Sequence, residues 1–127
     1  MKKYAGLLVT LAAVVIVIGS LVYLSKRESA KPGQYDKLAQ CLTEKGVKFY
    51  GASWCPHCAE QKRMFGSSIK HITYVECAKP GNQQGQTQAC DEAKIEGYPT
   101  WVFPDNSRLS GEQLPKVLGE KAGCSIE

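Results

Sequence analysis

The feature that most constrains this chain is a Cys-x-x-Cys pair, Cys55 and Cys58, which lies between an apolar stretch and a plausible helix. The apolar stretch, Val47 to Tyr50, is expected to be a strand, and the helix is expected to run to Phe65. That order places the first cysteine at a helix N-terminus, where unpaired N–H groups and the helix dipole favour a thiolate. Since two cysteines on one helical turn can also bond to each other, the pattern predicts reversible dithiol–disulfide chemistry.

Other uses of such a pair are a structural disulfide, half of a zinc site and a haem attachment site. A zinc ribbon requires a second close cysteine pair, but Cys77 and Cys90 are 13 positions apart. Covalent haem requires a histidine directly after the second cysteine, and Ala59 occupies that position. We therefore expect no metal and no cofactor other than the redox-active disulfide itself.

The N-terminal part of the 127-residue chain holds 20 consecutive uncharged residues, Ala5 to Leu24. A run of this length can span a bilayer as one helix. A cleaved signal peptide is the alternative, but Ser20 is followed by further apolar residues and no small-residue cleavage pattern closes the run. We therefore expect a cytoplasmic N-terminus (1–4), a transmembrane signal anchor (5–24), a tether (25–34) and a folded domain (35–127).

Charge and cysteine content indicate where the folded domain resides. The whole chain carries a net charge of +4, but residues 35–127 contain 11 basic and 11 acidic side chains. The excess positive charge flanks the apolar run, so it gives no indication of nucleic-acid binding, and it is too evenly divided to fix the orientation. All six cysteines lie beyond that run. Such a set favours an oxidising compartment, so we expect the domain to be extracytoplasmic, in a periplasm or an equivalent lumen.

Hydrophobic periodicity predicts eight elements in the folded domain, in the order helix, strand, helix, strand, helix, strand, strand, helix. Their expected ranges are 35–44, 47–50, 55–65, 72–76, 87–95, 101–103, 108–109 and 114–122. The polar stretch from Ala78 to Gln88 contains Pro80, Gly81 and Gly85 and is expected to be a loop. A βαβ unit that begins with Cys-x-x-Cys is typical of thioredoxin-like proteins. We therefore predict an α/β thioredoxin-like fold, with a central mixed sheet flanked by helices, preceded by one transmembrane helix.

The stretch Gly97-Tyr98-Pro99-Thr100 is a second point of similarity to thioredoxin-like proteins. In that family an X-Pro-Thr before the third strand carries a cis proline that faces the active disulfide. Because cis bonds are uncommon even at proline, the sequence alone does not predict one. The resemblance implies a cis bond at Pro99 and a backbone edge at Tyr98 that binds a substrate peptide.

A closer resemblance covers about Tyr35 to Cys124. The matching segments are Phe49–Cys58, Tyr74–Cys77, Cys90 and Ile95–Trp101, in that order. The chain resembles the thioredoxin-like domain fused to bacterial vitamin K epoxide reductase homologues, and the stand-alone membrane-anchored relatives of that domain. This chain has one apolar segment and no reductase domain, so the resemblance implies that a quinone-linked partner is a separate protein.

The four remaining cysteines are expected to form structural disulfides. The resemblance implies a bond between Cys77 and Cys90, and Cys41 and Cys124 then remain to pair with each other. Four cysteines permit three pairings, and the residues themselves do not choose among them. A functional alternative is electron transfer from the Cys55–Cys58 pair to Cys77 and Cys90.

Within the Cys-Pro-His-Cys motif, Cys55 is expected to be the exposed nucleophile and Cys58 the residue that resolves its mixed disulfides. Pro56 suits the first helical turn, because its missing N–H would have no partner there. His57, as a cation or hydrogen-bond donor, is expected to stabilise the Cys55 thiolate. The same dipeptide occurs in DsbA-type oxidases, whose potential lies about 150 mV above that of thioredoxin, or about 7 kcal/mol for two electrons. The motif therefore favours an oxidase.

One departure from thioredoxins concerns the buried acid that they carry six residues before the first cysteine. Phe49 occupies that position, so the role of moving the proton of the buried thiol is vacant or is performed by another residue. Glu60 is a candidate, although its position equally suits an exposed helix glutamate. His71 has no motif around it and is expected at the surface.

Three aromatic residues near the motifs have competing interpretations. Trp54 is expected to shape the docking surface beside the cysteine pair, and a core position is its alternative. Tyr98 is expected to contact substrate, with a simple turn aromatic as the alternative. Trp101 lies in an apolar strand and is expected in the core.

Together these patterns predict a membrane-anchored thiol–disulfide oxidoreductase. It would oxidise cysteines of exported proteins and be reoxidised by a membrane quinone reductase of the vitamin K epoxide reductase type. One alternative keeps the fold and reverses the electron flow, as a reductant or isomerase in cytochrome maturation or disulfide repair. Another is a non-enzymatic assembly factor with a vestigial disulfide.

Overall fold

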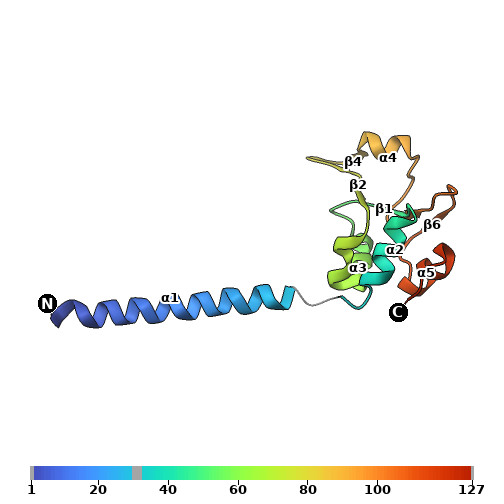
Figure 1. Cartoon of the computed structure of the whole chain (residues 1–127). Coiled ribbons are helices and arrows are strands. Elements are labelled where there is room, and N and C mark those ends of the chain that lie inside the picture. Colours follow the sequence, from blue (N-terminus) through green and yellow to red (C-terminus); the bar gives the residue numbers. More distant parts are fainter. Residues whose placement is uncertain (1, 30–32, 127) are drawn as a thin grey trace. The chain divides into compact units, whose positions relative to one another are not determined.

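The computed structural model describes residues 2–29 and 33–126, and the chain divides into two compact units, Met1–Lys31 and Pro32–Glu127. The first unit holds a single helix, α1 (Lys2–Ser29) (Figure 1). Its described side chains, at residue 6 and at residues 8–24, are exposed. The predicted span, residues 5–24, lies within α1, but among the described residues no helix is long and apolar enough to cross a membrane.

The helix α1 also covers the first half of the predicted tether. It continues to Ser29, so residues 25–29 are helical where a linker was predicted. The sequence there is charged but contains no glycine or proline, and nothing in it ends a helix. Residues 30–32 of the predicted tether lie outside the described residues.

The second unit is built on a mixed four-stranded sheet, as the sequence predicts. Its strands lie in the order β2 (Tyr74–Glu76), β1 (Lys48–Gly51), β5 (Thr100–Val102) and β6 (Arg108–Ser110). Strand β1 runs parallel to β2 and antiparallel to β5, and β6 is antiparallel to β5. The parallel strands β1 and β2, together with the helix α3 between them, form the βαβ unit that contains the cysteine motif.

The two faces of the sheet carry different sets of helices. One face packs against α2 (Asp36–Glu44), α3 (Pro56–Phe65) and α5 (Pro115–Ala122), and the 3₁₀ helix η1 (Gly66–His71) joins α3 to β2. The other face packs against α4 (Gln88–Glu92). Because successive strand residues point to opposite faces, Phe49 belongs to the first core and Tyr50 to the second.

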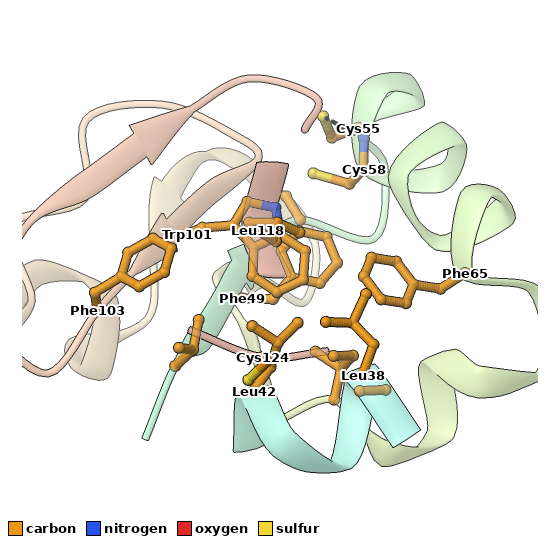
Figure 2. Packing of buried hydrophobic residues seen from close by; sticks show 14 residues of the cluster. Leu38, Leu42, Phe49, Cys55, Cys58, Phe65, Trp101, Phe103, Leu118 and Cys124 are labelled. Atoms are coloured by element: carbon orange, nitrogen blue, oxygen red, sulfur yellow. Dashed lines mark hydrogen bonds between the residues drawn. The ribbon is translucent and has the colours of Figure 1, made fainter. Parts of the chain in front are cut away.

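The larger core is centred on aromatic residues (Figure 2). Phe49 of β1 stacks on Trp101 of β5 with ring centroids 4.8 Å apart, and Phe65 of α3 lies 5.8 Å from the same indole. Trp101 is fully buried, which confirms its predicted core position. Leucines from α2 and α5 close this core on the helical side.

The polar stretch predicted as a loop is instead a small hairpin. Strand β3 (Ala78–Lys79) pairs antiparallel with β4 (Asn82–Gln86), and the turn between them places Gly81 at φ +72°. The side chain of Asn82 accepts N–H bonds from Gln84 and Gly85, which stabilises the turn. The hairpin lacks the alternating apolar pattern of a half-buried strand, because four of its five β4 residues are polar and three are exposed.

Two disulfides join elements that lie far apart in the sequence. Cys77 bonds to Cys90, which links the start of the hairpin to α4, and Cys41 bonds to Cys124, which links α2 to the residues after α5. The Cys77–Cys90 bond is the one that the resemblance implies, and Cys41 and Cys124 are the two cysteines that were then expected to pair. The sulfurs of both bridges are buried or half-buried, and neither bridge includes a cysteine of the Cys-x-x-Cys pair.

Candidate active site

The first cysteine of the motif caps the helix that follows it. Cys55 has extended backbone angles, φ −83° and ψ 119°, and α3 begins at the next residue, Pro56. The Cys55 sulfur accepts a hydrogen bond from the backbone N–H of Cys58 at 3.4 Å (Figure 2). Proline at the first helical position leaves no unpaired donor. An N–H bond and the positive end of the helix both favour negative charge on this sulfur.

The second cysteine lies deeper in the molecule. Cys58 is 1% exposed, and its sulfur points towards the aromatic core (Figure 2). Burial is the main reason that the pKa of the Cys58 thiol rises to about 12. Both Cys55 and Cys58 are free thiols in this structure. The prediction that Cys55 is exposed is wrong, because this residue is only 6% exposed and its sulfur contacts both the Cys58 N–H and the Tyr98 carbonyl oxygen. The pair therefore combines a capped sulfur with a more deeply buried thiol that holds its proton at neutral pH.

The histidine of the motif is held by a glutamate from another segment. His57 is exposed, and its Nδ1 lies 2.7 Å from Oε1 of Glu112, in the segment between β6 and α5. A carboxylate only accepts hydrogen bonds, so Nδ1–H is the donor. The histidine is thus fixed at the helix N-terminus, next to Cys55 in sequence, and its described hydrogen bond goes to Glu112 rather than to the sulfur.

The proline loop faces the cysteine pair. The Tyr98–Pro99 peptide bond is cis, as the resemblance implies, and Pro99 is fully buried. The Cys55 thiol is 3.8 Å from the backbone carbonyl oxygen of Tyr98, to which it donates. Thr100 anchors the loop by donating its hydroxyl to the Gly97 carbonyl at 2.8 Å. The backbone of Tyr98 thus borders the reactive sulfur directly.

An open groove begins beside this backbone. Trp54 is 45% exposed and meets the Tyr98 ring edge-on, with centroids 5.9 Å apart. The two aromatics line a groove of about 480 Å³ whose other wall is formed by the hairpin residues Gln83–Gln86 and by residues around α4. The Tyr98 hydroxyl donates to the Gln86 side chain at 2.7 Å, which joins the two walls. Trp54 is therefore a surface residue, not part of the core.

A buried amide fixes α3 to the loop before α5. Gln61 is completely buried, and its side chain donates to the Gln113 carbonyl oxygen at 2.9 Å. Its oxygen accepts the N–H of Gln113 at 2.7 Å and the indole N–H of Trp101 at 3.2 Å. All of these groups are satisfied, so the network holds the helix that carries both cysteines in one position.

A half-buried tyrosine and an exposed glutamate of β2 are hydrogen-bonded to each other near the pair. The Tyr74 hydroxyl donates to Oε2 of Glu76 at 3.0 Å, and Oε1 of Glu76 accepts the N–H groups of Ser53 and Ala78, each at 2.9 Å. Burial and the bond to Glu76 raise the pKa of Tyr74. Burial of Glu76 acts to raise its pKa, but the hydrogen bonds from Ala78, Tyr74 and Ser53 outweigh it, so the net shift is downward.

Two residues singled out in the sequence lie away from the cysteines. Glu60 forms a surface ion pair with Arg63, with contacts of 2.8 and 2.6 Å, so it takes the position of an exposed helix glutamate. His71 is half-buried and lies 3.6 Å from Asp36, whereas a surface position was predicted. Its burial arises because η1 packs closely on α2.

Four side chains of the site were not identified from the sequence as functional residues. Tyr74 and Glu76 belong to one of the segments that match the family, but the pattern of residues around them predicted only a strand. Gln61 and Glu112 carry no local signal, because their partners lie about 50 positions away in the sequence. Among the described residues, no three histidine, cysteine or acidic side chains gather in the arrangement of a metal site.

Curated proteins similar to this chain include the following two. One is "Thiol-disulfide oxidoreductase LTO1" of Arabidopsis thaliana, 46% identical over 93 residues, which cover 71% of this chain and 24% of that protein. The other is "Thioredoxin domain-containing protein 5 homolog" of Drosophila melanogaster, 34% identical over 76 residues, which cover 52% of this chain and 17% of that protein. The chain thus spans about a quarter or less of the length of these relatives. No protein-family model matches it.

The mixed sheet, the capped Cys-x-x-Cys pair and the cis proline beside it define a thioredoxin-like protein. More particularly, 93 residues of the chain are similar to a part of the thiol–disulfide oxidoreductase LTO1.

Proposed function

We propose that this chain oxidises cysteine thiols of exported proteins through a disulfide between Cys55 and Cys58. The geometry of the pair carries the proposal. The Cys55 sulfur accepts the Cys58 N–H at the N-terminus of α3 and adjoins the Tyr98 backbone, whereas Cys58 is buried more deeply, with 1% exposed against 6% for Cys55. Stabilising one sulfur as a thiolate stabilises the reduced pair, and this makes the disulfide a stronger oxidant. The Pro56-His57 dipeptide, which resembles that of DsbA-type oxidases, also supports electron flow from substrate thiols to this disulfide.

The substrate is proposed to bind along the groove between Trp54 and the β3–β4 hairpin. An extended peptide that places its cysteine at Cys55 can pair with the backbone of Tyr98, whose side chain forms part of the groove wall. The exposed indole of Trp54 offers apolar contact area next to the sulfur. Trp54, Tyr98 and Pro99 are therefore the proposed substrate-binding residues.

The proposed reoxidising partner is a vitamin K epoxide reductase-like quinone reductase in the membrane. Its support is the resemblance of this chain to thioredoxin-like domains that are fused to such reductases. Confinement of both proteins to one membrane would raise their effective concentration, in place of a covalent link. Quinone would then act only through the partner.

Residues 5–24 are proposed to attach the chain to that membrane, with the folded domain on the extracytoplasmic side. The support is the uncharged run itself, the exposure of its described side chains in α1, and the two disulfides of the folded domain. Fractionation of cells that express the full chain tests this, with a chain lacking residues 2–24 as the control. Release of the full chain by alkaline carbonate, together with the truncated chain, would contradict membrane attachment.

A Cys58→Ser variant tests the direction of electron flow, because it cannot resolve mixed disulfides formed at Cys55. We expect mass spectrometry of the trapped complexes to find a membrane quinone reductase and many exported proteins. The matched control is the double variant Cys55→Ser/Cys58→Ser, which should trap neither. Capture of a cytochrome maturation factor alone would support the reductant, and a potential near thioredoxin's, about −270 mV, rather than near −120 mV would contradict the oxidase.

A further inference from the structure

Thiol–disulfide exchange at this site requires that Cys58 lose and regain a proton, and its buried thiol needs a route for that proton. The thiol is buried and its pKa is about 12, so only a very small fraction is ionised at neutral pH. Thioredoxins place a buried acid six residues before the first cysteine, and Phe49 stands at that position here. Phe49 is fully buried and stacked on Trp101, so it moves no proton.

The neighbouring strand brings a polar side chain to the same place. In the parallel register of β1 and β2, Phe49 pairs with Tyr74 and Gly51 pairs with Glu76. The Tyr74 ring packs against the Phe49 ring with centroids 5.1 Å apart. Strand register thus places on β2 the polar group that β1 lacks.

Gly51 shows how close that hydroxyl lies to the thiol. A Cβ built on Gly51 would lie 3.0 Å from the sulfur of Cys58, 3.0 Å from the Tyr74 ring and 3.4 Å from the Tyr74 hydroxyl oxygen. The sulfur and the hydroxyl therefore border one small space, which the absence of a side chain at position 51 leaves open. A hydroxyl that donates to Glu76 keeps lone pairs with which to accept a proton.

The Glu76 end of the Tyr74–Glu76 hydrogen bond reaches solvent. Glu76 is exposed and lines a surface hollow of about 560 Å³ together with Ser53, Trp54 and the β3–β4 hairpin. Lys62 of α3 places its ammonium 3.7 Å from the centre of the Tyr74 ring, on the same side of the pair. The hydrogen bond from Tyr74 to Glu76 thus runs from the space beside the buried Cys58 sulfur to the solvent-exposed carboxylate.

We propose that Tyr74 and Glu76 form the proton relay of Cys58, in place of the buried acid of thioredoxins. The inference rests on the proposed thiol–disulfide exchange at Cys55 and Cys58. Tyr74 is the group that exchanges a proton with the sulfur, and Glu76 is a positioning residue that orients the hydroxyl and passes the proton to solvent.

During reoxidation of the pair the relay works outward. The Cys55 thiolate attacks a disulfide of the partner, which forms a mixed disulfide and releases one partner thiolate. Cys58 then loses its proton to the Tyr74 oxygen while the hydroxyl proton of Tyr74 passes to Glu76. The Cys58 thiolate attacks the Cys55 sulfur, so the Cys55–Cys58 bond forms and the second partner sulfur leaves as a thiolate. Two electrons pass to the partner disulfide, and Glu76 releases its proton to water.

During oxidation of a substrate the relay works inward. A substrate thiolate attacks the Cys55 sulfur, and Cys58 leaves as a buried thiolate. Tyr74 gives it a proton and recovers one from solvent through Glu76. Because Glu76 is a weak base, the outward transfer is uphill and proceeds as the new sulfur–sulfur bond consumes the thiolate.

The test separates the two chemical steps with oxidised glutathione as the disulfide. Reduced full-length protein is mixed with it, quenched with acid and analysed by mass spectrometry, which counts the mixed disulfide and the closed pair. We expect Tyr74→Phe and Glu76→Gln to form the mixed disulfide at the wild-type rate but to resolve it at least about tenfold more slowly. Glu60→Gln, which removes the surface carboxylate paired with Arg63, is the matched control and should resolve normally.

A pH profile distinguishes a relay from a merely structural role. The titratable groups near Cys58 are Cys55 and Lys62 from α3, Tyr74 and Glu76 from β2, and Tyr98 from the loop before β5. With the relay intact, the resolution rate should change little between pH 7 and pH 9. Without the Tyr74 hydroxyl, hydroxide must remove the proton, so the Tyr74→Phe rate should rise about tenfold per pH unit.

The possible outcomes separate this inference from the proposed function. If the wild type forms no mixed disulfide, the oxidoreductase proposal itself fails. If the wild type completes both steps and Tyr74→Phe resolves as fast with the same pH profile, only the relay is overturned. Far-ultraviolet circular dichroism and the two structural disulfides report whether each variant is folded, and Tyr74→Phe keeps the ring contacts with Phe49 and Lys62.

Discussion

The six cysteines of this domain occupy two contrasting settings. Cys41, Cys77, Cys90 and Cys124 are bonded across elements far apart in the sequence, and no described element opens these bonds to a groove. Cys55 and Cys58 lie on one helical turn and are free, and the Cys55 sulfur adjoins the backbone of Tyr98, a residue that lines the groove. The difference teaches that redox function here depends on position at a helix N-terminus and on access, since the bonded pairs have neither.

The largest expected effect comes from removing the reactive sulfur. Cys55→Ser should lower the rate of oxidation of a two-cysteine model peptide by at least about 10³-fold, because the other free thiol among the described residues, Cys58, is almost completely buried. Its unfolding midpoint in urea should stay close to that of the reduced wild type. Retained activity would show that Cys77–Cys90 carries electrons, the alternative considered from the sequence.

Removing the longer structural bridge should mainly affect stability. The Cys41–Cys124 bond closes a separation of 83 residues. By loop entropy, Cys41→Ala/Cys124→Ala should lower the free energy of unfolding by about 4.5 kcal/mol. Urea denaturation measures this loss, and peptide oxidation at 10 °C, where the variant remains folded, should proceed at the wild-type rate. A matching loss of activity in the folded variant would mean that the bridge belongs to the redox site.

Removing the shorter bridge, which lies closer to the groove, also tests whether a bonded pair has a structural role or a redox role. The Cys77–Cys90 bond closes a separation of 13 residues, so Cys77→Ala/Cys90→Ala should cost about 3 kcal/mol of unfolding free energy. The bridge holds the hairpin that forms one wall of the groove, so the KM for a peptide should rise while kcat changes little. A fall in kcat with unchanged KM would contradict a purely structural role.

The contrast between the two settings also explains what the sequence could predict. Cys55, Pro56 and Cys58 are adjacent, and their helix N-terminus follows from local order, so their arrangement was predictable. The cis bond at Pro99 came from a family resemblance, because local energetics disfavour it. Periodicity predicted the strands, and the mixed sheet was predicted from the likeness of the Cys-x-x-Cys unit to thioredoxin-like proteins.

The rest of the site depends on contacts that no local pattern records. Tyr74 reaches the cysteines only through the register of β1 with β2, and Glu112 meets His57 across 55 positions. The β3–β4 hairpin was missed because its polar strands carry no apolar alternation. Glu60 was a candidate by sequence distance alone, and its bond to Arg63 turns it away from the pair.

The smallest expected effect concerns the pH dependence of stability, and it sharpens the difference between Cys58 and an ordinary thiol. Burial raises the pKa of Cys58 from 9.0 to about 12 in the folded protein. Below pH 9 both the folded and unfolded thiols are protonated. Between pH 9 and pH 12 only the unfolded thiol ionises, so the folded state binds more protons and stability falls as pH rises.

For the reduced protein this linkage predicts a loss of about 1 kcal/mol between pH 8 and pH 10 that originates in Cys58. The comparison is with reduced Cys58→Ala, which keeps Cys55 and every other titratable group. Its own loss over the same interval, from urea denaturation at each pH, should be smaller by that amount. Equal losses in the two proteins would mean that the Cys58 thiol titrates normally. In that case the buried sulfur needs no proton relay through Tyr74, and the functional contrast between the two cysteines of the pair reduces to the position of Cys55 at the N-terminus of α3.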